Sequence, residues 1–476
     1  MIRSPTADTS TPVASSPVVR IQMSFVVEDV IGMFILLWFP RFGHRSQGFT
    51  SPGELPAGIN LRENPWTENH VTKELGSFAP LAAAHFLTTF NSNFMKNALV
   101  FLVIASMPLA QAEYMSSFVS AAFMFPMIFL SGLGGQLADR YDKSRLSILL
   151  KGLEMAAVGC AAVGVALGSY WVTLCGVLLL QVVGSLFGPV RSSLIPSLVS
   201  KESVPQANAW IEGLSFAALV GGLWFVGFAF GLPQGQRTAA TACVLVVAAL
   251  SFTAVRFIPD GIAAPSGSRV DWNVFKGTWR TLRDAAAEST LFRPIILLGW
   301  SWFMASLALS TTPALVARAG GSSAEASWVM IAYGVSGAVA AQIAARICRW
   351  ASSGSAVAVA IAGQSASALA IWLASGGDVK AEVLYVALCA LGAFHSLALI
   401  PLASFIQVHA REGRKARSAA ASNIVNAGFM VIGGFGVAGI QMVGAGLPAI
   451  YAAAAAISVA AVVAMGCAYM PIQRRS

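Results

Sequence analysis

The chain has 476 residues, of which 56% are hydrophobic and 11% are charged, and its mean hydropathy is +0.71. A soluble globular protein of this length could not bury so much apolar surface, so the composition excludes that class and indicates an integral membrane protein. The net charge of +9 does not indicate a nucleic-acid partner, because the basic residues lie between apolar segments rather than on one face or tail.

The first 78 residues differ in composition from the rest of the chain. Residues 1–20 are rich in Ser, Thr and Pro, which is typical of disorder. The apolar run from Val30 to Phe39 contains ten residues and is too short to cross a bilayer, so we interpret it as an interfacial helix or as unstructured chain. We expect residues 1–78 to form a disordered or accessory extension.

Twelve apolar segments follow, and each has the length of about 20 residues that a helix needs to span a membrane. They cover approximately residues 80–107, 115–138, 146–167, 171–198, 205–230, 237–258, 291–317, 325–346, 355–375, 381–409, 418–442 and 446–470. The sequence therefore predicts an all-α integral membrane protein with twelve transmembrane helices.

The turn between the second and third segments is short and polar, and four basic residues lie around it: Arg140, Lys143, Arg145 and Lys151. From the second segment onward, nineteen Lys and Arg residues lie on the side of the membrane that holds this turn, and three lie on the other side. Because cytoplasmic loops carry an excess of Lys and Arg, this distribution predicts that both termini are cytoplasmic.

The longest connection between the segments, residues 259–290, divides them into six and six. Within it, Phe275, Trp279, Leu282 and Ala286 fall on one helical stripe, and three basic residues lie elsewhere. This pattern fits a helix on the inner membrane surface, and a solvated linker helix fits equally well. The expected organisation is an N-terminal six-helix bundle at 79–258, a cytoplasmic linker at 259–290, a C-terminal six-helix bundle at 291–470 and a tail at 471–476.

A short repeat supports two related halves. Residues 135–140, GQLADR, recur as residues 341–346, AQIAAR, again at the cytoplasmic end of the second helix of a half. Asp139 of the first copy is replaced by Ala345 in the second, so we expect the first copy to form the stronger latch on the cytoplasmic side.

The first copy resembles the signature G-x-L-a-D-r-x-x-r-r of the major facilitator superfamily, although the family's usual glycine after Arg140 is absent. The resemblance implies a transporter in which two six-helix pseudo-repeats rock around a substrate path between them. The gating residues that we expect on this basis are Asp139, Arg140, Arg145, Arg346 and Arg417.

Ionisable groups are costly inside a bilayer, so those within the predicted spans are candidates for function. Lys96 lies near the middle of the first span, on a polar stripe that includes Asn93. Such a stripe faces a cavity or forms hydrogen bonds between helices. Arg191 and Glu212 lie at similar depth in the fourth and fifth spans, and we interpret them as partners. The alternatives are Lys96 as the partner of Glu212 and Asp139 as the partner of Arg191.

Several further blocks together resemble the lysophospholipid transporter family, namely residues 90–99, 188–191 with Pro196, 208–212, 301–303 and 401–427. The resemblance implies inward movement of lysophospholipids, such as lysophosphatidylethanolamine, across a bacterial inner membrane for re-acylation. Members usually carry Asp where Ser92 stands, and two Asn where Ser422 and Asn423 stand, and both departures bear on which headgroup is selected. The residues that we expect to bind substrate are Ser92, Asn93, Lys96, Asn97, Arg191, Glu212, Asn423 and Asn426.

A proton-coupled exporter of drugs or small solutes on the same fold is the alternative, although residues 213–222 lack the G-x3-G-P-x2-G-G pattern of such exporters. A membrane enzyme or scaffold is less favoured, because the sequence shows no metal-ligand cluster, nucleophile with a base, or phosphate-binding loop. None of the five His residues belongs to an H-x4-D acyltransferase motif, so any acyltransferase is expected to be a separate partner. We expect a monomer without cofactor or metal.

Overall fold

The structure is a computed structural model that describes residues 68–262, 270–350, 353–375, 381–442 and 447–469. The apolar run at Val30 and the predicted tail lie outside these ranges. Within them the regular elements are thirteen α-helices and one short 3-10 helix. The helices are α2 (Glu68–Ser106), α3 (Leu109–Arg140), α4 (Lys143–Ala166), α5 (Tyr170–Leu198), η2 (Lys201–Ser203), α6 (Val204–Phe230), α7 (Gln234–Val255), α8 (Val274–Ala287), α9 (Ser289–Arg318), α10 (Ser323–Trp350), α11 (Ser353–Ala374), α12 (Ala381–His409), α13 (Lys415–Met442) and α14 (Leu447–Tyr469).

Eight helices in the described ranges are long and apolar enough to cross a membrane, which confirms the predicted all-α membrane class. They are α4, α5, α6, α7, α9, α10, α11 and α12. The number of twelve spans stays a prediction, although six long helices precede the short α8 and six follow it.

The first helix starts earlier than the apolar pattern predicts. α2 begins at Glu68 rather than near residue 80, and it continues through Pro80. Its first turns are polar, and hydropathy does not mark polar turns that extend a helix beyond the bilayer. These turns are held by the Glu74 carboxylate, which accepts hydrogen bonds from Ser200 N at 3.1 Å and from Ser203 Oγ at 2.9 Å.

The turn between α3 and α4 is as short as the sequence predicts, because α3 ends at Arg140 and α4 begins at Lys143. Asp142 is the N-cap of α4, and its side chain accepts a hydrogen bond from Arg145 N at 2.9 Å. A carboxylate at this position satisfies a backbone donor that the first turn of a helix leaves free. We call the end of the bundle that holds this turn the Asp139 end.

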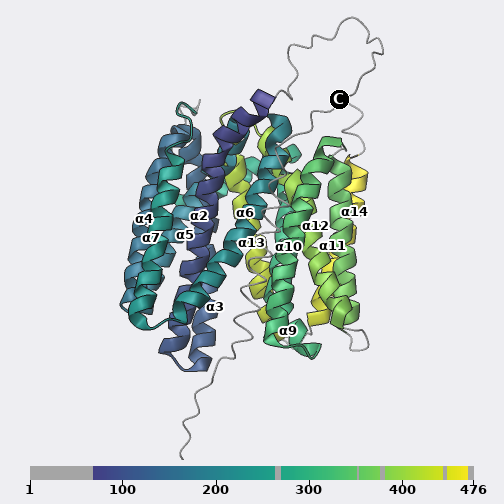
Figure 1. Cartoon of the computed structure of the whole chain (residues 1–476). Helices are drawn as coiled ribbons and strands as arrows, with labels where there is room; N and C mark the ends of the chain where they lie inside the picture. Colours follow the sequence, from purple (N-terminus) through teal and green to yellow (C-terminus); the bar gives the residue numbers. More distant parts are fainter. Residues whose placement is uncertain (1–67, 263–269, 351–352, 376–380, 443–446, 470–476) are drawn as a thin grey trace, which may run out of the picture. The chain divides into compact units, whose positions relative to one another are not determined.

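Each set of six helices has its own packing. In the first set, α2 packs on α5, α6 and α7, and α4 packs on α5 and α7. In the second set, α9 packs on α12 and α13, and α11 packs on α12 and α14 (Figure 1). The packed helices bury large apolar side chains such as Phe94 and Leu194 in the first set and Met304 and Leu315 in the second.

The two sets meet where α3 packs against α13 and α6 packs against α10. Gly135 permits the first contact, since a Cβ atom there would lie only 2.8 Å from the carbonyl oxygen of Ala416. Near this contact, Ala416 of α13 is buried in an apolar cluster of the first set, and Ala209 of α6 is buried in a cluster of the second. The two halves therefore interlock at the Asp139 end.

Candidate functional site

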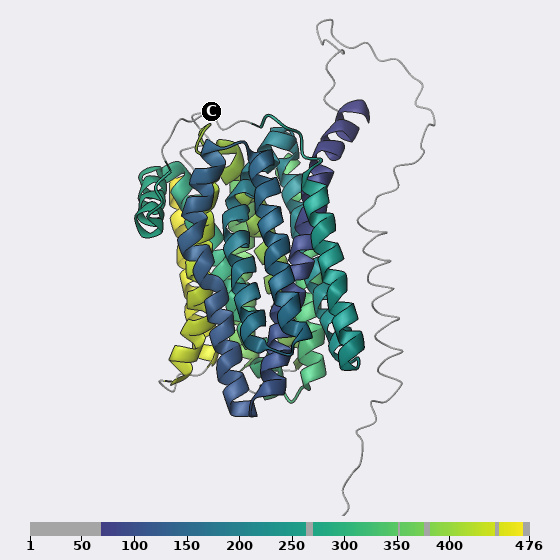
Figure 2. The ribbon, with the colours of Figure 1, turned by 90° about the vertical axis from the view of Figure 1, so that its left-hand side faces the viewer.

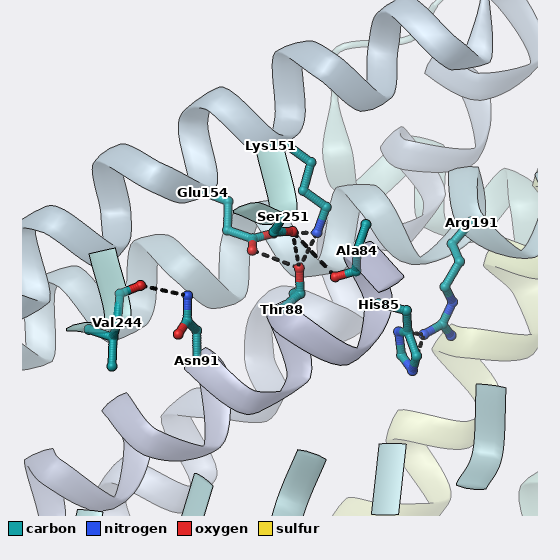
Figure 3. A network of polar contacts seen from close by, with 9 residues as sticks. All are labelled: Ala84, His85, Thr88, Asn91, Lys151, Glu154, Arg191, Val244 and Ser251. Carbon is teal, nitrogen blue, oxygen red and sulfur yellow. Dashed lines mark hydrogen bonds and ion pairs between the residues drawn. The ribbon is translucent and has the colours of Figure 1, made fainter. Parts of the chain in front are cut away.

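Arg191, His85 and Ser215 form a hydrogen-bonded chain within the first six helices, which we call the Arg191 chain. Arg191 Nη1 lies 2.8 Å from His85 Nδ1 (Figure 3), and His85 Nε2 lies 2.6 Å from Ser215 Oγ. The Ser215 hydroxyl donates its own proton to the carbonyl oxygen of Ile211 at 2.7 Å. We therefore assign His85 Nε2 as the donor to Ser215 and Nδ1 as the acceptor from the guanidinium, whose Nη1 atom also lies 3.4 Å from Nε2. This assignment makes His85 a neutral imidazole.

Glu212 lies beside this chain. It precedes Ser215 by one turn of α6, on the same side of that helix. It is close enough to Arg191 for an electrostatic interaction. Among the described residues, however, the Glu212 carboxylate forms no ion pair within hydrogen-bonding range. The guanidinium thus contacts His85 instead of pairing directly with Glu212.

The second half approaches the same level through α13. A Cβ atom on Gly188 would lie 2.9 Å from Asn423 Nδ2, and Gly188 precedes Arg191 by one helical turn. Asn426 is 7% exposed, and within the described residues its Oδ1 atom has no hydrogen-bond partner. Of the predicted substrate-binding residues, Arg191, Glu212 and Asn423 are therefore brought together across the two halves.

Lys96 lies at a different level. It is eleven residues from His85 on α2, which corresponds to roughly 16 Å along the helix. Its ammonium group stands 5.1 Å from the centre of the Phe123 ring. The side-chain amides of Asn93 and Asn97 donate to the backbone carbonyl oxygens of Thr89 and Asn93, at 2.8 and 2.7 Å. Ser92 is half-buried on the same helix. Lys96 and Arg191 thus form two separate positive centres, and one phosphate group could not contact both.

The predicted gating residues separate into a joined pair and an exposed group. The Asp139 side chain is 2% exposed, and its Oδ2 atom lies 3.3 Å from Arg417 Nε across the two halves. Its Oδ1 atom accepts a hydrogen bond from Ala416 N at 3.1 Å. Asp139 therefore binds the N-terminal end of α13, where the helix dipole favours a negative charge. The other predicted gating residues, Arg140, Arg145 and Arg346, are exposed.

A second contact between the halves was missed from the sequence. Gln342 Oε1 accepts a hydrogen bond from Gln206 Nε2 at 2.8 Å, and Gln342 Nε2 donates to the carbonyl oxygen of Ala209 at 3.2 Å. Asn208 Nδ2 donates to Gln407 Oε1 at 3.0 Å beside it. We call this set of contacts the amide latch.

The repeat held a signal for the amide latch, because Gln342 stands where the first copy has Gln136. In the first half Asp139 binds α13 and Gln136 accepts from Asp271 N at 2.8 Å. In the second half the carboxylate is missing at Ala345, and the glutamine makes the contact with α6.

A buried ion pair in the first half was also missed. Lys151 and Glu154 are 1% and 2% exposed, and Lys151 Nζ lies 2.6 Å from Glu154 Oε2. Lys151 also donates to the Thr88 hydroxyl, which in turn donates to Glu154 Oε1 at 2.7 Å and lies 3.1 Å from Ser251 Oγ (Figure 3). The ammonium group stands 4.2 Å from the centre of the Phe187 ring. The signal in the sequence was a Lys and a Glu three residues apart within one apolar segment.

Other chemistry is less well supported in the part of the chain that the structure describes. Its His, Cys, Asp and Glu residues form no group that could hold a metal ion. An apolar cavity of about 260 Å³ lies between α9 and α14, lined by side chains such as Trp300, Phe303 and Ile450. None of the predicted site residues lines it. The polar groups at the meeting of the two halves are therefore the candidate site.

Comparison with known proteins agrees with this architecture. Residues 81–436 match the model of the Major Facilitator Superfamily. The chain is 27% identical over 230 residues to the lysophospholipid transporter LplT of Yersinia enterocolitica, a match that covers 45% of this chain and 52% of the relative. It is also 27% identical over 180 residues to LplT of Yersinia pestis, covering 38% and 42%. The chain thus spans about half the length of the curated relatives that it matches.

Solved structures show the same fold. The human organic anion transporter MFSD10 matches with a TM-score of 0.67 at 16% identity, over 82% of this chain and 99% of that one. A bacterial homologue of the iron transporter ferroportin, in an outward-facing state, matches with a TM-score of 0.66 at 14% identity, over 84% and 99%. Since the family model covers most of the chain and the helices have the matching arrangement, the chain belongs to the Major Facilitator Superfamily and is a membrane transporter.

Proposed function

We propose that the protein moves lysophospholipids, such as lysophosphatidylethanolamine, across a bacterial inner membrane, with both termini in the cytoplasm. The proposal rests on one observation: a cation and a carboxylate lie near each other without forming a direct ion pair. Arg191 is hydrogen-bonded to a neutral His85, and Glu212 stands nearby without an ion pair among the described residues. A zwitterionic headgroup has the complementary charges. The relatives that match part of this chain are named lysophospholipid transporters, which supports the same substrate class.

In this proposal Arg191 binds the phosphate of the headgroup. Its Nε atom is buried and has no acceptor among the described residues. A buried donor without an acceptor costs about 1–3 kcal/mol, so the structure retains an unused donor that a phosphate oxygen would satisfy. A guanidinium also matches the geometry of phosphate better than an ammonium group does.

Glu212 binds the ammonium group of the same headgroup, and Asn423 and Asn426 complete the site from the second half. A second binding site for the headgroup lies on α2, roughly 16 Å along the helix from His85. It consists of Lys96 with Ser92, Asn93 and Asn97. A headgroup would occupy the two levels in succession as the halves move.

Movement follows alternating access. The Asp139 end is closed by the Asp139–Arg417 pair and by the amide latch. Opening this end requires both sets of contacts to break, while the two six-helix sets keep their own packing. We propose that the protein acts as a monomer and that a separate acyltransferase consumes the lysophospholipid it delivers.

The experiment is a leaflet-resolved assay with fluorescent lysolipids in proteoliposomes. Arg191→Gln should reduce movement of every phosphate-containing lysolipid by at least about tenfold, the effect of losing one charge-assisted contact. Glu212→Gln should reduce movement of lysophosphatidylethanolamine and spare lysophosphatidylglycerol, which has no ammonium group. Arg318→Gln, at an exposed position at the end of α9, is the matched control. If the wild-type protein moves neither lysolipid faster than empty liposomes do, the proposal is wrong.

A proton-coupled exporter remains the second candidate because Glu212 has the properties of a proton carrier. Its carboxylate is half-buried and, within the described residues, free of an ion pair. Drug efflux from the same vesicles that collapses with the proton gradient, and that is lost in Glu212→Gln, would favour the exporter over the lipid transporter.

A further inference from the structure

The short helix α8 has three distinct faces. Gly277, Thr278 and Thr281 are buried against the bundle. Phe275 and Trp279 form an apolar face and are 68% and 69% exposed. Just before the helix, Trp272 is also 69% exposed. The buried face is therefore made of small and polar residues. The Phe275 ring packs edge-on against the Phe129 ring of α3, with 5.2 Å between ring centres, and most of the Phe275 and Trp279 surfaces stay exposed.

A basic face lies next to the aromatic face. This basic face is rotated around the helix axis by about a quarter of a turn from the aromatic face, and it consists of Lys276, Arg280 and Arg283. All three are exposed, with the side chains of Arg280 and Arg283 at 47% and 68%. A helix with one aromatic and one basic exposed face is typical of segments that lie in the interface of a membrane.

The position of α8 on the bundle places these faces at the edge of the bilayer. The Thr278 hydroxyl donates to the carbonyl oxygen of Phe129 on α3 at 3.0 Å, and α8 lies on the outside of the bundle (Figure 2). α3 contains 32 residues and is therefore about 48 Å long, against a hydrocarbon core of about 30 Å. Even if all of the excess length of α3 lay at its Asp139 end, Phe129, about 16 Å from that end, would stand at the edge of the hydrocarbon core.

At that depth the outward rings meet lipid rather than water. Rings exposed to water would form an apolar patch with an unfavourable free energy, whereas the boundary between headgroups and acyl chains accommodates both the rings and the neighbouring cations. Membrane surfaces that contain anionic lipids attract each such cation by about 1 kcal/mol. The charge and the depth together favour a lipid over a protein as the occupant.

α8 is also linked to the residues that close the Asp139 end. Gln136 Oε1 accepts a hydrogen bond from Asp271 N, and Asp271 forms an ion pair with Arg280 at 3.4 Å. Gln136 precedes Asp139 by one helical turn on α3. A small cavity of about 30 Å³ on the inner face of α8 is bordered by both Thr281 and Arg417.

We propose that α8 is a binding surface for the headgroups of anionic phospholipids at the Asp139 end of the bundle. The aromatic face lies among the upper acyl chains, and the basic face binds the phosphates. This surface is separate from the Arg191 chain, and it does not depend on which substrate is carried.

The test uses the full-length protein in nanodiscs that contain a minority of lipid with brominated acyl chains. Bromine quenches the fluorescence of nearby tryptophan side chains. The part of the fluorescence that comes from Trp272 and Trp279 is obtained by subtracting the signal of the Trp272→Phe/Trp279→Phe variant. Brominated phosphatidylglycerol should quench this contribution more than brominated phosphatidylcholine at the same fraction. Loss of one basic side chain should lower the anionic preference by up to about fivefold. Lys276→Gln/Arg280→Gln/Arg283→Gln should abolish it.

Lys201→Gln, which removes an exposed charge at the first residue of η2, is the control and should keep the preference. Equal quenching by the two lipids in the wild-type protein would overturn the proposed charge recognition even if the triple variant failed to fold. Absence of quenching by either lipid would show that the rings do not lie in the membrane, and would leave a protein partner as the occupant of α8.

Discussion

Asp139 on α3 and Arg417 on α13 join the two halves of the transporter through an ion pair with a buried carboxylate and a half-buried guanidinium, with 3.3 Å between Asp139 Oδ2 and Arg417 Nε. The same carboxylate accepts a hydrogen bond from Ala416 N, at the first turn of α13. A guanidinium and the positive end of a helix dipole thus share one carboxylate. Closure of this end therefore depends on the negative charge of Asp139.

Asp139→Asn should open the Asp139 end, because the amide keeps the shape of the side chain and loses its charge. Hydrogen bonds to charged groups contribute about 1.5–3 kcal/mol, so the open population should rise by roughly ten- to a hundredfold. Spin labels at Arg145→Cys and Glu412→Cys, on opposite halves, report this opening by electron–electron resonance in a background without native cysteines. Asp260→Asn, an exposed position, is the control. An unchanged distance distribution would show that Asp139 does not hold this end closed.

Gln342→Ala should weaken closure independently of Asp139. The amide latch consists of neutral hydrogen bonds, each worth about 0.5–1.5 kcal/mol, so the shift should be smaller than for Asp139→Asn. Because the two contacts use different helix pairs, the effects of Gln342→Ala and Asp139→Asn should add in the double variant. The same spin-label distances measure both. A double variant no more open than Asp139→Asn alone would mean that the amide latch does not resist opening.

The fold could be predicted from the sequence because the bilayer sets the length of every spanning helix. The segments predicted at 171–198 and 381–409 agree with α5 and α12 to within one residue. The start of α2 could not be predicted in this way, since its polar turns are held by contacts such as that of Glu74 with Ser200.

The candidate site was predictable in its residue types but not in its partners. Arg191 and Glu212 stood out as charges in apolar segments, yet the contact with His85 depends on how α2 and α5 pack. Lys151 was counted with the basic turn because it follows Arg145 closely in the sequence. In the structure it points back into the bundle toward Glu154. The sequence shows where a charged residue occurs, but only the packing of the helices shows which group neutralises its charge.

The Lys151–Glu154 pair should stabilise the first half only while both members are present. Removing one partner of a buried pair leaves an uncompensated charge and costs about 3–5 kcal/mol, whereas removing both is often neutral. Lys151→Met and Glu154→Gln should each lower the unfolding temperature in detergent, and the double variant should recover most of the loss. Lys201→Met is the control at an exposed position. Equal or additive losses in the double variant would show that the two residues act separately.

Lys96 gives a prediction in which stability and transport change in opposite directions. Its ammonium group is half-buried above the Phe123 ring, and among the described residues it forms no ion pair. A charge in this position destabilises the protein unless an anionic ligand compensates it. Lys96→Ala should therefore keep or raise the unfolding temperature while it abolishes lysolipid movement in proteoliposomes, and Lys96→Arg should retain part of the movement. Lys201→Ala should change neither measurement. Unchanged transport in Lys96→Ala would remove Lys96 from the substrate path, and a clear fall in unfolding temperature would show that its role is structural.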